Sequence, residues 1–207
     1  MQAQGKQAQD KTMNAFDRAV LLWLNGLTGK VQFFDDLMRV IATDYLMPLA
    51  FSVALVSLWF AGRSREERFK YQMAALAGMS AVGLSNVAVW LINISWARPR
   101  PFVPLGDEVN LLFYPPTDPS FPANPVAVGF AVGYAVWRVN RPFGAALCIA
   151  AAAFGFSRLY AGVFWPTDII AGAAVGVLVT WGTVRVGWLL EPLPTLFIRL
   201  ARAIGLA

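Results

Sequence analysis

The stretch from Tyr71 to Trp96, YQMAALAGMSAVGLSNVAVWLINISW, decides the fold class because it contains no charged residue. A helix needs about 20 predominantly apolar residues to cross the hydrocarbon core of a bilayer, and this stretch is longer. Four further apolar blocks meet or approach the same requirement: 45–61, 123–137, 143–160 and 168–190. The sequence therefore predicts an all-α integral membrane protein with about five transmembrane helices.

The composition supports a membrane protein and excludes several classes of function. Charged residues make up 14% of the 207-residue chain, whereas soluble domains contain about 25%. The chain has no histidine and one cysteine, so it lacks the side chains that usually hold zinc, copper or iron–sulfur centres. We therefore expect no metal and no cofactor. The net charge is +5, but basic residues at the ends of apolar blocks are typical of membrane topology, so we expect no nucleic-acid partner.

The sequence divides the chain into four parts. Residues 1–13 are polar and are expected to be flexible. Residues 14–43 repeat apolar residues at helical spacing, which predicts two amphipathic helices on the membrane interface. Packing of these helices on the bundle is an equally compatible interpretation. Residues 44–190 are expected to form the transmembrane bundle, and residues 191–207 a basic amphipathic tail.

Two glycine pairs predict close packing inside that bundle. Gly129 and Gly133 lie in one predicted span, and Gly172 and Gly176 lie in another. The G-x-x-x-G spacing places both glycines of a pair on one helix face, where neighbouring backbones can approach closely.

Basic residues predict the orientation of the bundle. Loop 62–70, the turn 138–142 and the tail are basic, and all three lie on one side of a five-span bundle. The positive-inside rule places that side, with the C-terminus, in the cytoplasm. The predicted location is the bacterial inner membrane, with the connections 98–122 and 160–166 on the extracytoplasmic side.

Three motifs follow or precede the span ends on that predicted outer side. They read NISWARPRPF at 93–102, PSFPANP at 119–125 and SRLYAGVFWPTD at 157–168. In order and in internal spacing they resemble the three signature motifs of the type 2 phosphatidic acid phosphatase / vanadium haloperoxidase superfamily. The resemblance extends from about residue 14 to residue 190, and it implies a helical bundle with a phosphate site where the motifs meet.

The sequence differs from the family pattern at the positions to which the resemblance assigns catalytic roles. The resemblance implies a nucleophilic histidine in the third motif and a proton-donating histidine in the second, and Phe164 and Pro125 hold these positions. Asn93 replaces the first-motif lysine, and Ala123 and Asn124 replace a serine and a glycine of the second motif. Loss of a nucleophile or its acid–base partner removes several orders of magnitude of rate. The sequence therefore predicts no catalytic residue at these positions.

Three motif residues are retained, namely Arg100, Arg158 and Asp168. Guanidinium groups suit phosphate bidentately, so the two arginines are candidates for binding a phosphate or lipid head group. An unpaired charge at membrane depth is costly, so Arg158 is alternatively expected to pair with Asp168 and to join two spans. Asp168 also fits as an acidic cap in the first turn of a helix. Arg98 is expected to be a cation that faces the interface.

These observations predict a catalytically inactive protein that keeps the phosphatase-like bundle as a scaffold. Its predicted role is an accessory subunit of a larger respiratory or photosynthetic membrane complex, with membrane lipids and other integral membrane subunits as partners. One alternative is a protein that binds an anionic lipid or a polyprenyl phosphate through Arg100 and Arg158. The other is a lipid phosphate phosphatase with altered chemistry, in which Tyr160 or Ser157 is a conceivable nucleophile although no base is evident to activate it.

Overall fold

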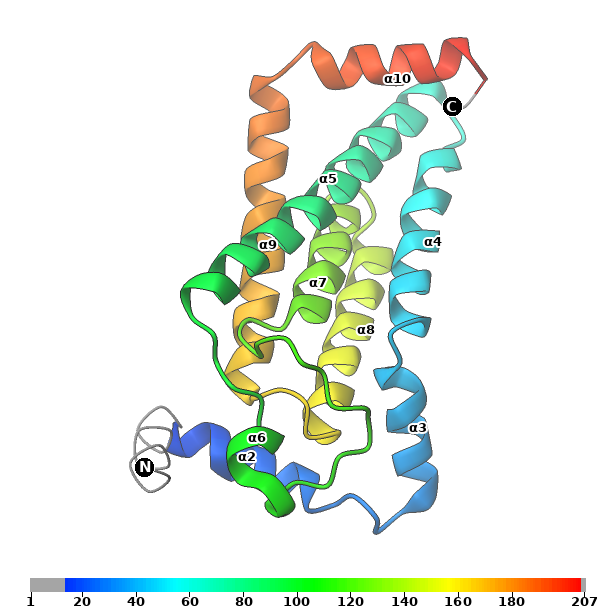
Figure 1. Cartoon of the computed structure of the whole chain (residues 1–207). Coiled ribbons are helices and arrows are strands. Elements are labelled where there is room, and N and C mark those ends of the chain that lie inside the picture. The colour runs from blue at the N-terminus through cyan, green and yellow to red at the C-terminus, as the bar shows by residue number, and fades with distance from the viewer. Residues whose placement is uncertain (1–13, 206–207) are drawn as a thin grey trace.

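The computed structural model describes residues 14–205, and every regular element in this part of the chain is a helix (Figure 1). The predicted all-α architecture is therefore confirmed. The elements are α2 (Ala15–Asn25), α3 (Gln32–Ala42), α4 (Leu46–Phe60), α5 (Arg65–Ser95), α6 (Phe102–Leu105), η1 (Gly106–Glu108), α7 (Asn124–Trp137), α8 (Arg141–Tyr160), α9 (Pro166–Leu189) and α10 (Leu193–Ala203). The predicted flexible segment 1–13 lies outside the described residues.

Local sequence signals set where the long helices begin. The Ser64 hydroxyl accepts a hydrogen bond from the amide of Glu67 at 3.1 Å and caps α5. Asn140 caps α8 in the same way, through the amide of Phe143 at 3.1 Å. Pro166 occupies the first turn of α9, where a missing N–H group costs nothing. These caps satisfy backbone donors that would otherwise be left unpaired at the helix ends.

Three helices, α5, α8 and α9, are long and apolar enough to cross a membrane by themselves. Helices α3 and α4 meet at a 50° bend and pass the same test together, which brings the number to four within residues 14–205. The sequence predicted about five spans, and the difference lies in α7, which has only 14 residues. Eight of the 14 residues of α7 are buried. Protein rather than lipid surrounds this helix, so it does not need the length of a free-standing span.

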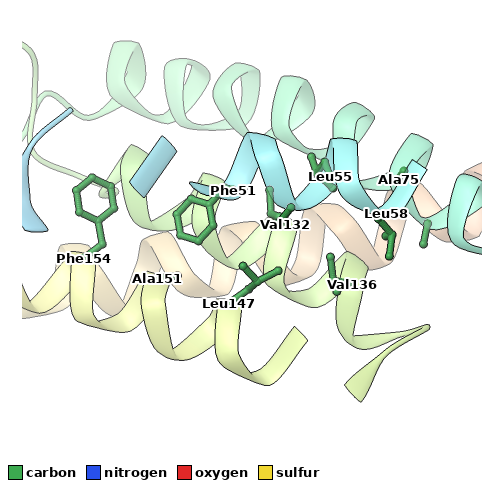
Figure 2. Packing of buried hydrophobic residues seen from close by; sticks show 11 residues of the cluster. Phe51, Leu55, Leu58, Ala75, Val132, Val136, Leu147, Ala151 and Phe154 are labelled. Carbon is green, nitrogen blue, oxygen red and sulfur yellow. The ribbon is translucent and has the colours of Figure 1, made fainter. Parts of the chain in front are cut away.

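Small residues in the centre of the bundle let the helices approach closely. The main apolar cluster joins α4, α5, α7 and α8 (Figure 2), and its largest buried side chains include Phe51 and Phe154. On α9, a Cβ atom at Gly172 would lie 2.5 Å from the carbonyl oxygen of Ala123, and one at Gly176 would lie 2.2 Å from that of Ala127. The backbones of α7 and α9 therefore touch at these glycines, as the G-x-x-x-G spacing predicted.

The two N-terminal helices pack on one end of the bundle. Leu21 and Leu24 of α2 are buried in a cluster with Leu159 and Trp165 from the ends of α8 and α9. The structure thus shows these helices packed on the bundle, which was one of the two compatible interpretations of the sequence. That the two helices also lie on a membrane surface stays a prediction. The tail forms α10, which lies across the opposite end of the bundle and buries Ile198 (Figure 1).

Candidate functional site

The three sequence motifs meet at the end of the bundle that also carries α2 and α6 (Figure 1). Backbone hydrogen bonds join them directly. The amide of Ser120 donates to the carbonyl oxygen of Arg98 at 2.9 Å, and the amide of Ala123 donates to that of Asp168 at 3.0 Å. Residues 96–101 after α5 and the loop before α7 are therefore held against the start of α9. This convergence is what the positions of the motifs at the span ends predicted.

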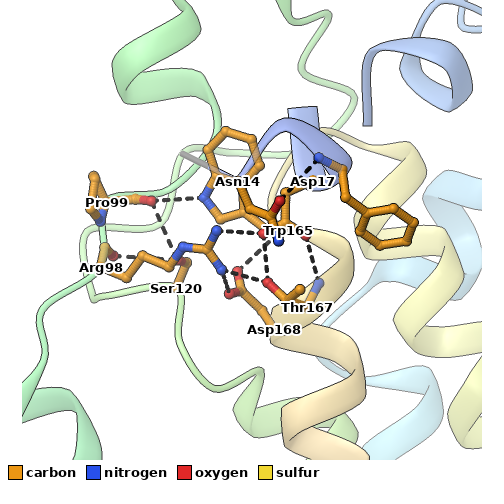
Figure 3. A network of polar contacts seen from close by, with 9 residues as sticks. Asn14, Asp17, Arg98, Pro99, Ser120, Trp165, Thr167 and Asp168 are labelled. Atoms are coloured by element: carbon orange, nitrogen blue, oxygen red, sulfur yellow. Dashed lines mark hydrogen bonds and ion pairs between the residues drawn. The ribbon is translucent and has the colours of Figure 1, made fainter. Parts of the chain in front are cut away.

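A buried network surrounds Arg98 (Figure 3). One terminal nitrogen of its guanidinium donates to Asp168 Oδ1 at 2.6 Å and to Thr167 Oγ1 at 2.7 Å. The other donates to Asp17 Oδ2 at 2.6 Å. The side chains of Arg98, Asp17 and Asp168 are 8%, 1% and 0% exposed. The expectation that Arg98 faces the interface is therefore wrong, because Arg98 pairs with two buried carboxylates, one on α2 and one on α9.

Asp168 forms both an ion pair and a helix cap, but its cation is not the predicted one. Its Oδ1 atom accepts from Arg98, and its Oδ2 atom accepts from the amide of Trp165 at 2.9 Å. Arg158 instead pairs with Asp44, which lies in the break between α3 and α4. The expected tether between Arg158 and Asp168 is therefore wrong. Asp44 lies 114 residues from Arg158 along the chain, so only the folded structure brings the two together.

The two candidate phosphate-binding arginines are buried, whereas their acidic partners are exposed. Arg100 and Arg158 are each 4% exposed at the side chain, while Asp118 is 62% exposed and Asp44 41%. Arg100 binds the Asp118 carboxylate at 2.9 Å and donates to the carbonyl oxygen of Val163 at 3.1 Å. Burial lowers the pKa of Arg100, and the nearby charge of Arg158 acts in the same direction against the opposing effect of Asp118. Two guanidinium groups thus lie near each other in a poorly solvated place, and each is paired with one exposed carboxylate.

Aromatic rings cover both guanidinium groups. The Phe164 ring lies 4.4 Å from the Arg100 guanidinium carbon, and the Phe113 ring lies 4.3 Å from that of Arg158. Cations are attracted to ring faces at these distances. Phe164, at the position where the resemblance implies a histidine, therefore holds a phosphate-binding candidate in place instead of presenting a nucleophile.

Tyr114 extends this site through Asp44. Its hydroxyl donates to Asp44 Oδ2 at 2.5 Å, on the carboxylate that also binds Arg158. That hydrogen bond raises the pKa of Tyr114, and burial adds to the effect. The phenol therefore keeps its proton at neutral pH and remains a donor.

The other departing motif positions lie around the same region. Asn93 is on the last turn of α5, while Ala123, Asn124 and Pro125 open α7. The Asn124 amide nitrogen donates to Asn86 at 2.9 Å, but its oxygen has no hydrogen-bond partner. Within residues 14–205, four buried side-chain atoms lack a partner, and three belong to motif residues: Asn93 Oδ1, Asn124 Oδ1 and Arg158 Nε. Such groups retain hydrogen-bonding capacity for a bound molecule.

The sequence did not predict the acidic residues that pair with the arginines of this site. Asp17, Asp44 and Asp118 each bind a motif arginine, yet none lies within a motif. Asp17 belongs to the amphipathic N-terminal region and Asp44 follows directly after it, and acidic residues at such positions are normally solvated. The one available signal was that a buried arginine requires a counter-ion, which does not identify the partner.

The comparisons with known proteins agree with the motifs. Residues 74–191 match the family model described as the PAP2 superfamily. Undecaprenyl-diphosphatase BcrC of Bacillus subtilis (strain 168) is 28% identical over 181 residues, which cover 87% of this chain and 89% of the relative. Among solved structures, Aquifex aeolicus LpxE is 25% identical with a TM-score of 0.66, covering 83% of this chain and 96% of its own. A PAP2 type phosphatidylglycerolphosphate phosphatase from Bacillus subtilis shares the fold at 14% identity, with a TM-score of 0.61 and coverage of 89% and 92%.

These findings confirm the family resemblance and contradict the predicted function. A relative that matches 87% of the chain is named as a diphosphatase, so the prediction of an inactive accessory subunit is wrong, as is the prediction that the chain is not an enzyme. The alternative of a lipid phosphate phosphatase with altered chemistry fits better. The wrong prediction assumed that a site without histidine cannot catalyse a reaction, although other polar side chains can take part in catalysis.

Proposed function

This chain belongs to the PAP2 superfamily, and from that premise we propose that it is a membrane phosphatase acting on a lipid-linked diphosphate. The observation that carries the proposal is the pair of buried arginines, Arg100 and Arg158, whose counter-ions are exposed carboxylates. The substrate class follows from the relative named undecaprenyl-diphosphatase, which covers 87% of this chain. We also propose a bacterial inner membrane location, with this site on the extracytoplasmic side, because the opposite end of the bundle carries the basic loops.

Substrate binding begins with an exchange of anions at the arginines. Asp118 and Asp44 are exposed enough to turn into solvent, whereas Arg100 and Arg158 are fixed by burial and by their aromatic neighbours. A phosphate group presents several oxygens and can bind both guanidinium groups bidentately. The unpaired Nε atom of Arg158 supplies a further donor. The incoming phosphate therefore replaces two carboxylates without leaving a buried charge unpaired.

The proposed reaction is a direct attack of water on phosphorus, because the chain contains no histidine to form a phosphohistidine. The water oxygen forms a bond to the terminal phosphorus, and the bond from phosphorus to the bridging oxygen breaks. The products are inorganic phosphate and the lipid monophosphate. The proton lost by water passes to the carboxylate of Asp44 or Asp118, the two acidic groups beside the arginines. The two guanidinium groups stabilise the charge on the transferring phosphoryl oxygens.

A diphosphate substrate also accounts for Pro125 at the position that the resemblance assigns to a proton donor. The leaving group is then a phosphate monoester, which departs as an anion without being protonated. An alkoxide leaving group would need a general acid there, and proline cannot supply a proton. The substrate class and the altered motif are therefore mutually consistent.

Phosphate release from undecaprenyl diphosphate by the purified chain in detergent micelles tests the proposal. The wild-type chain is expected to release phosphate above the detergent blank. Arg158→Ala is expected to lower the rate about a hundredfold, because it removes a donor that stabilises the transition state. Arg158→Lys keeps the charge but loses the bidentate geometry, so an intermediate rate is expected.

The matched control is Arg18→Ala on α2, which breaks an exposed ion pair with Glu108 and should leave the rate unchanged. Thermal unfolding of each variant separates a loss of chemistry from a loss of structure. Pure wild-type protein that binds the lipid diphosphate and releases no phosphate would contradict the proposed function.

A further inference from the structure

A cavity lies at the opposite end of the bundle from the three motifs. Its volume is about 450 Å³, and it is a partly open cavity lined by residues of α5, α7, α9 and α10 and of the turn after α7. Pockets that bind small organic ligands span roughly 300–1,000 Å³, so this cavity is large enough to hold part of one. Its walls are mainly apolar and include Met73, Leu76, Ala77, Val184 and Phe197. A purely polar ligand would gain little from such walls.

Two basic side chains, Lys70 and Arg138, line the same cavity. Lys70 is already paired with Glu66, at 2.8 Å. Arg138 is exposed, and within residues 14–205 it has no ion pair. The cavity therefore combines apolar walls with one basic group that is free to bind an anion.

The surrounding end of the bundle is basic, and its carboxylates are engaged. Arginines 63, 65, 68, 141, 185, 199 and 202 lie in the loops and helix ends there. The acidic residues of this end are Glu66, Glu67 and Glu191. Glu66 binds Lys70, Glu67 accepts from the amide of Arg63 at 2.9 Å, and Glu191 accepts from Thr195 at 2.8 Å. The local field at Arg138 thus favours an anion.

The depth of the cavity suits a lipid. It lies where α5 begins and α9 ends, and helices of this length that cross a bilayer bring such ends near the lipid head groups. Helix α10 crosses this end (Figure 1) and contributes Pro194 and Phe197 to the wall. Arg202 of α10 donates to the buried Gln72 of α5 at 2.7 Å, which fixes the helix over the cavity.

We propose that this cavity binds an anionic phospholipid, with an acyl chain against the apolar walls and the head-group phosphate on Arg138. Basic pockets between transmembrane helices bind anionic head groups in this way. The site lies at the other end of the bundle from the motif arginines, so it is independent of the proposed phosphatase reaction and is tested separately.

Native mass spectrometry of the delipidated full chain tests this site, with dioleoyl phosphatidylglycerol and dioleoyl phosphatidylcholine as probes. The wild-type chain is expected to retain phosphatidylglycerol at least about fivefold better than phosphatidylcholine, because only the first carries a net negative charge for Arg138. Arg138→Gln is expected to abolish this preference. Arg141→Gln is the matched control, because Arg141 is also exposed at this end but does not line the cavity.

Two further measurements address the acyl chain. Ala77→Phe fills the cavity without changing the charge, and it is expected to lower the retention of both lipids. An excess of glycerol phosphate, which carries the head-group charge without acyl chains, is expected to leave the bound phosphatidylglycerol in place. The proposal is overturned if Arg138→Gln keeps the preference, if Arg138→Gln and Arg141→Gln reduce it equally, if Ala77→Phe retains both lipids, or if glycerol phosphate displaces the lipid.

Discussion

Replacing Arg98 with alanine is expected to destabilise the folded chain by about 3–5 kcal/mol, since it leaves buried carboxylates without their cation. Arg98 binds Asp17 and Asp168, both at 2.6 Å, and the three side chains are at most 8% exposed. Asp17 lies on α2 and Asp168 on α9, so the change also removes one of the contacts that hold α2 to the end of the bundle. The free energy of unfolding in detergent, measured by denaturant titration, checks the result.

The control for this variant is Arg18→Ala on α2, next to Asp17. Arg18 pairs with Glu108 at 3.0 Å, but these side chains are 43% and 53% exposed. An exposed ion pair contributes about 0–1 kcal/mol, so little change is expected. Adding Asp17→Asn to Arg98→Ala should recover part of the lost stability by removing one of the unpaired charges. Equal effects of Arg98→Ala and Arg18→Ala would show that Arg98 is not a buried charge.

Gly176→Ala and Gly182→Ala are expected to change stability in opposite directions, although both add one methyl group to α9. A Cβ atom at Gly176 would lie 2.2 Å from the carbonyl oxygen of Ala127 and 2.9 Å from the amide nitrogen of Ala131. Both neighbours are backbone atoms, so α7 and α9 must separate. We expect a loss of about 1–3 kcal/mol, the usual effect of overpacking.

At Gly182 an added Cβ atom meets nothing within 4 Å. Alanine there should stabilise α9 by up to about 1 kcal/mol, because it has a higher helix propensity than glycine. The same denaturant titration in detergent measures both variants. Shifts of the same sign would contradict the contact between α7 and α9.

Part of the candidate site could be predicted because the motifs lie at the ends of spans. Helices of similar length that cross one bilayer bring their ends to the same level, so the segments around Arg100, Ser120 and Arg158 were expected to meet. Neighbouring residues along the sequence also predicted the cap at Asp168, since capping involves groups within one turn. Both inferences use only local periodicity and the thickness of a membrane.

The pairing of charges was not predictable in the same way. Because an unpaired charge at membrane depth is costly, the sequence predicted that Arg158 pairs with Asp168 of the same motif. In the structure, Asp168 binds Arg98, and Arg158 binds Asp44 from the break between α3 and α4. An ion pair depends on which side chains become buried together, and that is set by how the helices pack.

By itself the sequence determined the helical class, the membrane environment and the family, because hydropathy, helix period and motif spacing are properties of neighbouring residues. Only the tertiary structure decided that α7 is a short helix enclosed by protein, that Asp17 enters the site from α2, and that Phe164 lies against Arg100. These features arise from contacts between segments far apart in the chain. Close packing and the free-energy cost of burying a charge determine which of these contacts form. The pattern of neighbouring residues along the chain does not reveal them.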